Sequence, residues 1–205
     1  MAWEHLRSTY DTVASKYEAR FVDELRDKPH DRALLLAFAE SSTDPVVEIG
    51  CGPGQIGAFV GARGRRVVGL DLSSNMARLA AVRLGAALIA DMRELPFVTG
   101  QLGGVLAFYS LIHLRRAEVG GVLREIQRVL RPGGAVLFSA HEGDGEVVLE
   151  EFIGERVPLA ATFFTLDELV DASRDAGFDV TSATRREPYE SESTLRLYVA
   201  ATKPD

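Results

Sequence analysis

The chain of 205 residues has a single cysteine, only three lysines and no long apolar run. One cysteine, Cys51, cannot form a disulfide within the chain, so a disulfide framework is excluded. No apolar stretch approaches the roughly 20 residues needed to span a bilayer, and residues 1–25 are interrupted by charge every few positions. We therefore expect a cytoplasmic protein that has no signal peptide and no membrane partner.

Basic residues and metal ligands are also few. Lys and Arg number 23 against 30 Asp and Glu, which gives a formal net charge of −7. Such a chain lacks the broad basic surface that binds a phosphate backbone, so no nucleic-acid partner is expected. The histidines, at positions 5, 30, 113 and 141, lack the spacing of metal ligands. We predict no metal site.

Short apolar strands alternate with helical stretches along the chain. Runs apolar on both faces begin at Val46, Val67, Ala87, Val105 and Ala135, which is typical of strands buried inside a parallel sheet. The alternation predicts an open α/β sandwich, and the length fits one domain over residues 1–205. Helices are predicted over residues 31–40, 73–84, 117–130 and 165–177, and an antiparallel edge hairpin over residues 178–186 and 194–202.

The strongest local signal lies in residues 46–57, where a strand runs into closely spaced glycines and then into a helix. Glycines without side chains let a ligand lie against backbone amides at the helix start. The spacing of Gly52, Gly54 and Gly57 also satisfies the dinucleotide fingerprint. The loop therefore indicates a nucleotide-like cofactor without identifying it.

Three acidic residues narrow the choice of cofactor. Asp71 ends the second strand, where a carboxylate can accept hydrogen bonds from both ribose hydroxyls. Asp91 ends the third strand, where the exocyclic amine of adenine can donate to it. Glu48, just before the glycines, would repel a pyrophosphate but attract a ligand that carries an ammonium and a sulfonium. These acids favour a positively charged adenosine derivative.

Several motifs follow one another in a fixed order along the chain, in residues 48–54, 68–73 with Met76, 90–97, 130–134 and 164–178. Together they resemble the motifs of class I S-adenosylmethionine-dependent methyltransferases. The resemblance implies a Rossmann-like sandwich, with a seven-stranded, mostly parallel sheet, an antiparallel last strand and helices on both faces. It also implies S-adenosyl-L-methionine as cofactor and S-adenosyl-L-homocysteine as product.

The same resemblance implies which residues contact the cofactor. Gly50 and Gly52 should pass close to its methionine part, Asp71 should bind ribose, and Asp91 with Met92 should hold adenine. In small-molecule members a segment like residues 1–30 folds over the cofactor as a helical cap. The expected cofactor-binding residues are Tyr10, Tyr17, Glu48, Gly50, Cys51, Gly52, Gly54, Gln55, Asp71, Leu72, Met76, Asp91, Met92 and Tyr109.

Two histidines are candidate catalytic bases. His113 follows the fourth strand and His141 the fifth, and ligands of open α/β sheets bind outside the carboxyl ends of the strands. A histidine with an ordinary pKa of about 6.5 is largely neutral at working pH and can accept a proton. Two alternatives stay open: His113 packs at the start of the next helix, and His141 is an exposed loop residue.

Three further segments suggest how the acceptor is bound and how two loops fold. Arg115 and Arg116 can hold a carboxylate or phosphate by paired hydrogen bonds, although arginines on a helix face are more often solvated. Residues 142–164 mix glycine and proline with acids and hydrophobic residues, and we expect them to form a substrate lid. Residues 102–104 replace the usual Phe-Asp of the family with Leu-Gly-Gly, which predicts a looser turn.

The leading hypothesis is a methyltransferase that acts on a small molecule, with oxygen slightly favoured as the acceptor atom. The Asn/Asp-Pro-Pro-aromatic motif of amino-methylating enzymes is absent, because residues 108–111 read Phe-Tyr-Ser-Leu. Two alternatives stay open. One is an NAD-linked oxidoreductase that uses the glycine fingerprint, and the other is a regulatory protein that binds S-adenosylmethionine without catalysis.

Overall fold

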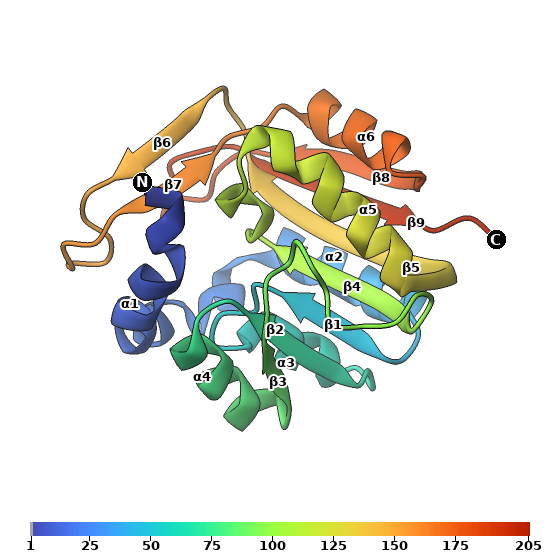
Figure 1. The fold of residues 1–205 in the computed structure, drawn as a ribbon, viewed down its shortest axis with the longest axis horizontal. Coiled ribbons are helices and arrows are strands. Elements are labelled where there is room, and N and C mark those ends of the chain that lie inside the picture. The colour runs from blue at the N-terminus through green and yellow to red at the C-terminus, as the bar shows by residue number, and fades with distance from the viewer. Residues whose placement is uncertain (1) are drawn as a thin grey trace.

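A seven-stranded sheet forms the centre of the molecule in the computed structural model, which describes residues 2–205 (Figure 1). The strand order is β3-β2-β1-β4-β5-β9-β8. The first five strands pair in parallel, whereas β9 is antiparallel to both β5 and β8. This confirms the predicted sheet with its antiparallel last strand. The strands are β1 (Val46–Ile49), β2 (Val67–Asp71), β3 (Ala87–Ile89), β4 (Leu102–Phe108), β5 (Leu130–His141), β8 (Asp179–Arg186) and β9 (Arg196–Thr202).

Helices cover both faces of the sheet. Val105 and Ala107 of β4 pack in one hydrophobic cluster with α5 and α6, while Leu106 and Phe108 pack in a second with α2 and α3. Successive side chains of a strand point to opposite faces, so a run apolar at every position must be covered twice. The helices are α1 (Leu6–Phe21), α2 (Pro29–Ser41), α3 (Gln55–Gly61), α4 (Ser74–Leu84), α5 (Val119–Val129) and α6 (Leu166–Asp175), with short 3-10 turns η1 (Ala2–His5), η2 (Glu24–Asp27), η3 (Leu111–His113) and η4 (Arg116–Glu118). No helix within residues 2–205 is long and apolar enough to cross a membrane.

Helix ends follow the local sequence signals. Ser73 caps α4 by accepting a hydrogen bond from the Met76 amide at 3.1 Å. Thr165 and Glu168 form a capping box at the start of α6, with reciprocal hydrogen bonds of 2.8 and 3.2 Å. Each cap satisfies backbone amides that have no partner inside the helix.

Two local expectations were wrong. The fifth strand begins at Leu130, directly after α5, and not at Ala135, so residues 130–134 already belong to the strand. Residues 102–104 form no loose turn, because Leu102 is fully buried and opens β4. A Cβ atom on Gly103 would overlap the carbonyl oxygen and hydroxyl of Thr43. Glycine allows this close approach of two backbone segments.

Residues 142–164 contain a separate two-stranded antiparallel sheet that the sequence patterns did not predict. Its strands are β6 (Glu146–Leu149) and β7 (Leu159–Thr162), called here the β6–β7 hairpin. Figure 1 shows this hairpin beside α1, beyond one end of the parallel strands. The Thr9 hydroxyl of α1 donates to the Pro158 carbonyl at 2.6 Å and ties the two elements together.

Replacing Gly103 by alanine tests the packing of β4. The new methyl group must displace the Thr43 backbone, and overpacking of this kind costs about 1–3 kcal/mol. We expect Gly103→Ala to lower the free energy of unfolding in urea by that amount. Gly61→Ala is the matched control, because no atom lies within 4 Å of its Cβ position. Equal stability of the two variants would contradict the assigned contact.

Candidate functional site

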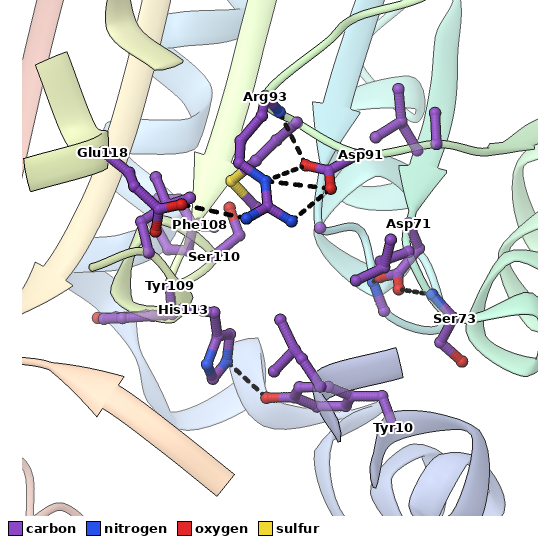
Figure 2. Close-up of a pocket in the computed structure, with 18 of the residues that line it drawn as sticks. Tyr10, Asp71, Ser73, Asp91, Arg93, Phe108, Tyr109, Ser110, His113 and Glu118 are labelled. Atoms are coloured by element: carbon purple, nitrogen blue, oxygen red, sulfur yellow. Dashed lines mark hydrogen bonds and ion pairs between the residues drawn. The ribbon is translucent and has the colours of Figure 1, made fainter. Parts of the chain in front are cut away.

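Two cavities lie side by side at the carboxyl ends of the parallel strands. The smaller has a volume of about 260 Å³ and the larger about 570 Å³. Residues from α1, the glycine loop and the end of β4 line both, so the cavities share a wall. Figure 2 shows the lining of the smaller cavity. The residues of this shared wall are Tyr10, Tyr17, Gly50, Gly52, Phe108, Tyr109 and His113.

Asp71 fixes the glycine loop against the end of β2. One carboxylate oxygen accepts a hydrogen bond from the Gly52 amide and the other from the Ser73 amide, both at 2.8 Å. The side chain is buried and lines the smaller cavity. Burial raises the pKa of Asp71 to about 6 against the lowering effect of these amides. The carboxylate therefore shapes the loop and still faces the cavity.

The three loop glycines share a left-handed backbone conformation but face different surroundings. Their φ values are 64° at Gly50, 51° at Gly52 and 83° at Gly54, and only Gly50 and Gly52 line the two cavities. Gly54 lines neither cavity, and a Cβ there would lie 3.2 Å from Ala80 in α4. Its expected contact with a cofactor is therefore not supported by its position, because Gly54 serves the packing of α4 against the loop.

Glu48 of β1 contacts the backbone of the first turn of α3. Its carboxyl group accepts a hydrogen bond from the Gly57 amide at 2.9 Å, and burial raises its pKa to about 8. The Gly52 and Gly57 amides thus already donate to carboxyl groups of the chain itself. A bound pyrophosphate would need such amides. This arrangement disfavours the dinucleotide alternative.

Arg93 spans one end of the smaller cavity. Its guanidinium contacts both Asp91 oxygens, with a closest distance of 2.6 Å, and Glu118 at 3.1 Å (Figure 2). Met92 and Leu72 line the same cavity. The expected hydrogen bond from an adenine amine to Asp91 would compete with this ion pair. Sequence reasoning missed Arg93 because its partner in space, Glu118, is 25 residues away.

His113 joins three separate elements at the shared wall. Its Nδ1 lies 3.0 Å from the Ala160 carbonyl oxygen of β7, and its Nε2 lies 2.7 Å from the Tyr10 hydroxyl of α1 (Figure 2). A carbonyl only accepts, so Nδ1 carries the hydrogen and Nε2 accepts from Tyr10. Burial lowers the pKa of His113 to about 4. The residue is therefore a neutral group within the site.

His141 lies in the larger cavity and is not an exposed loop residue. Its ring stacks on Tyr109 with a centroid distance of 5.3 Å, and Nδ1 lies 3.0 Å from the Thr194 hydroxyl. Burial lowers the pKa of His141 to about 3, and the nearby Arg196 charge acts in the same direction. Tyr109 itself has a positive φ of 54° and bonds the Tyr198 hydroxyl at 2.9 Å.

Of the other expected site residues, some line a cavity and others do not. Cys51 and Gln55 line the larger one, and Arg115 lines the smaller one. Met76 is fully buried and lines neither. Arg116 also lines neither, because its guanidinium bonds Glu168 and the Phe163 carbonyl. The expected role of Arg116 in substrate binding does not fit this placement.

Charged residues of the larger cavity come from segments without any sequence motif. Lys28 follows η2, Glu192 precedes β9, and Arg196 opens β9. Glu192 brings them together, because its carboxylate lies 3.6 Å from both Lys28 Nζ and Arg196 Nε. Apolar side chains of the β6–β7 hairpin and its flanks face the same cavity, namely Val147, Leu149, Phe152, Leu159, Ala161 and Phe163. No cluster of three metal-binding side chains occurs among residues 2–205.

Curated proteins with similar sequences are methyltransferases. A family model described as a methyltransferase domain matches residues 46–134. An uncharacterised methyltransferase from Geobacillus kaustophilus is 29% identical over 140 residues, which cover 67% of this chain and 64% of that protein. A malonyl-(acyl-carrier protein) O-methyltransferase from Serratia marcescens is 33% identical over 134 residues, 64% of this chain and 51% of that protein. The chain thus spans about half to two thirds of these relatives.

A solved structure extends the similarity to nearly the whole chain. The 1,6-didemethyltoxoflavin-N1-methyltransferase of Burkholderia thailandensis, with bound 1,6-didemethyltoxoflavin and S-adenosylhomocysteine, gives a TM-score of 0.72 at 26% identity. The match covers 98% of this chain and 88% of that one. The aligned region therefore includes α1 and the β6–β7 hairpin.

The raised pKa of Glu48 predicts a pH-dependent stability. In the unfolded chain Glu48 loses its proton near its ordinary value of 4.5, whereas in the folded chain it keeps the proton up to about 8. The folded state binds more protons in this window, so the free energy of unfolding falls as pH rises. Glu48→Gln removes the titration and keeps an acceptor for Gly57.

We expect the stability of Glu48→Gln relative to the natural protein to rise between pH 5 and 8, by at most about 1.4 kcal/mol per pH unit. Urea unfolding at several pH values measures it. Glu40→Gln, at an exposed position of α2, is the control and should show no such trend. A pH-independent difference for Glu48→Gln would show that its carboxyl group is already ionised.

Proposed function

We propose that the chain is a class I S-adenosylmethionine-dependent methyltransferase that methylates a small molecule bound in the larger cavity. The methyltransferase-domain model that matches residues 46–134 and the methyltransferase structure that aligns with 98% of the chain support this. The observation that carries the proposal is the shared wall of the two cavities. A cofactor in one cavity and an acceptor in the other would meet at the glycine loop. Methyl transfer requires the acceptor atom to lie close to the methyl group and in line with its bond to the donor atom.

The smaller cavity fits S-adenosylmethionine. Asp71 presents carboxylate oxygens that ribose hydroxyls can donate to, and Gly50 and Gly52 leave the backbone open to a close ligand. The buried Ser110 hydroxyl lines this cavity and has no hydrogen-bond partner within residues 2–205, as expected for a group that meets a ligand. Glu48 lies in the wall of the larger cavity, where a bound ammonium or sulfonium would lower its pKa and be attracted to the ionised carboxylate.

S-adenosylmethionine, when bound, supplies a methyl group already activated by its sulfonium. The chain itself must orient the acceptor and exclude water. Tyr10 and Tyr17 of α1 close the shared wall on one side, and Phe108 and Tyr109 close it on the other. The β6–β7 hairpin covers the larger cavity with apolar side chains, which suits the expected lid.

The Tyr10–His113 pair supports oxygen as the acceptor atom. A hydroxyl oxygen becomes strongly acidic as it takes up a methyl group, so a base with a pKa of about 4 suffices to take its proton. An ammonium group, with a pKa of about 10, would not release its proton to such a base. The acceptor proton can pass to the Tyr10 oxygen while the Tyr10 hydroxyl donates to His113.

Calorimetric titration with S-adenosylhomocysteine tests the cofactor site. We expect binding to the natural protein, and a loss of about 1–3 kcal/mol in Asp71→Ala, the range for leaving buried polar partners unsatisfied. Asp175→Ala, at an exposed position of α6, should bind normally. Thermal stabilisation by NAD and not by S-adenosylhomocysteine would reverse the proposal in favour of an oxidoreductase.

Substitution of His113 tests the proton acceptor. We expect His113→Gln to lower turnover by roughly a hundredfold while the affinity for S-adenosylhomocysteine is kept, because general-base catalysis contributes on that order. Transfer of a labelled methyl group to an acceptor from a screening panel measures turnover. His5→Gln, at an exposed position, is the control. A normal rate in His113→Gln would reduce His113 to a packing role.

A further inference from the structure

Arg196 borders the larger cavity with one edge of its guanidinium unpaired. The residue opens β9 and exposes only 9% of its surface. Its Nη1 donates to the Thr194 carbonyl at 2.7 Å and to the Thr194 hydroxyl, and its Nε lies 3.6 Å from Glu192. Its Nη2 has no hydrogen-bond or ion-pair partner in the described chain. A nearly buried cation with free donors indicates an anionic ligand.

Thr194 passes the influence of Arg196 on to His141. A guanidinium only donates, so the Thr194 oxygen accepts from Arg196. Within residues 2–205 the Thr194 hydroxyl has no other hydrogen-bond acceptor than His141 Nδ1, 3.0 Å away, and we assign its hydrogen to that bond. The neutral His141 ring then carries its hydrogen on Nε2, which has no partner among residues 2–205. His141 is thus a hydrogen-bond donor in the larger cavity. This assignment replaces its expected role as a base.

The acidic residues nearby are already engaged by other cations. Both oxygens of Glu192 accept from Arg186, at 2.8 and 3.1 Å. Glu24 pairs with Lys28 at 2.6 Å. Within residues 2–205 the ion-pair partner of Arg196 is Glu192, 3.6 Å from Nε, and Glu192 is shared with Arg186 and Lys28. An anion next to Arg196 would give Nη2 a direct partner.

The surroundings of this anion site suit a ring. The Arg196 guanidinium lies 5.5 Å from the centre of the Tyr109 ring. The His141 ring stacks on Tyr109 with a centroid distance of 5.3 Å. Phe152 and Phe163 line the same cavity from the β6–β7 hairpin segment. A volume of about 570 Å³ is within the usual range for small-molecule sites.

We propose that the acceptor is an aromatic carboxylate, whose carboxylate group accepts hydrogen bonds from Arg196 Nη2 and His141 Nε2. This inference rests on the proposed function, because it concerns the acceptor of that reaction. Arg196 and His141 line only the larger cavity and not its shared wall. The carboxylate therefore anchors the acceptor, and the atom that is methylated lies at the other end, beside Tyr10 and His113.

Calorimetry on protein saturated with S-adenosylhomocysteine tests the anchor. The probes are benzoate, salicylate and nicotinate, each compared with its carboxamide. We expect at least one carboxylate to bind with a Kd below about 1 mM and its amide to bind at least about tenfold more weakly. Arg196→Gln should lose about tenfold or more in carboxylate affinity, and Arg196→Lys less, because lysine keeps the charge but not the paired donors.

The controls separate the two proposals. Arg66→Gln, whose side chain is 79% exposed, should bind every probe as the natural protein does. S-adenosylhomocysteine affinity should stay unchanged in both Arg196 variants, which also shows that they fold. If S-adenosylhomocysteine binds but no carboxylate does, or amides bind equally well, or Arg196→Gln keeps full affinity, the anchor is wrong and the proposed function stands. If S-adenosylhomocysteine itself does not bind, the proposed function fails.

Discussion

Buried carboxyl groups hydrogen-bonded to the backbone of the glycine loop hold the site in shape. Asp71 binds the Gly52 amide and Glu48 binds the Gly57 amide, so the loop is tied to β2 and to β1 at the same time. Ionised carboxylates are costly to bury without a cation, and burial accordingly raises the pKa of both. Carboxyl groups so placed disfavour a diphosphate, whereas a cation bound beside them would lower their pKa and offset the cost of burying the charge. S-adenosylmethionine, which carries an ammonium and a sulfonium, meets that electrostatic constraint.

The two histidines differ in the same way, because the hydrogen-bond partner of each ring determines which of its nitrogens donates and which accepts. His113 gives its Nδ1 hydrogen to a backbone carbonyl and keeps Nε2 as an acceptor, facing Tyr10. In the proposed arrangement His141 accepts at Nδ1 from Thr194, which leaves Nε2 as a donor. Burial lowers the pKa of both rings. The two proposals therefore give the histidines opposite tasks, one towards a proton and one towards an anion.

Closure of the site depends on elements far apart in the chain. Tyr10 from α1 meets His113 after β4, and His113 meets Ala160 in the β6–β7 hairpin. Thr9 adds a second link between α1 and that hairpin segment. These hydrogen bonds join three elements over the shared wall of the cavities. Movement of α1 or of the hairpin would therefore alter the environment of His113 directly.

The sequence by itself determined the α/β sandwich, the antiparallel edge hairpin, the helix caps and the glycine loop with Asp71 beside it. Each of these depends on residues near one another in the chain, where periodicity, capping and glycine spacing act. Only the tertiary structure decided that Arg93 occupies Asp91, that Arg116 faces away from the cavities, and that Arg196 faces the larger one. It also built a strand from residues 102–104, where the local pattern favoured a turn. The partners of a long charged side chain, and the close approach of Gly103 to Thr43, depend on which segments the sheet brings together, and no local pattern carries that information.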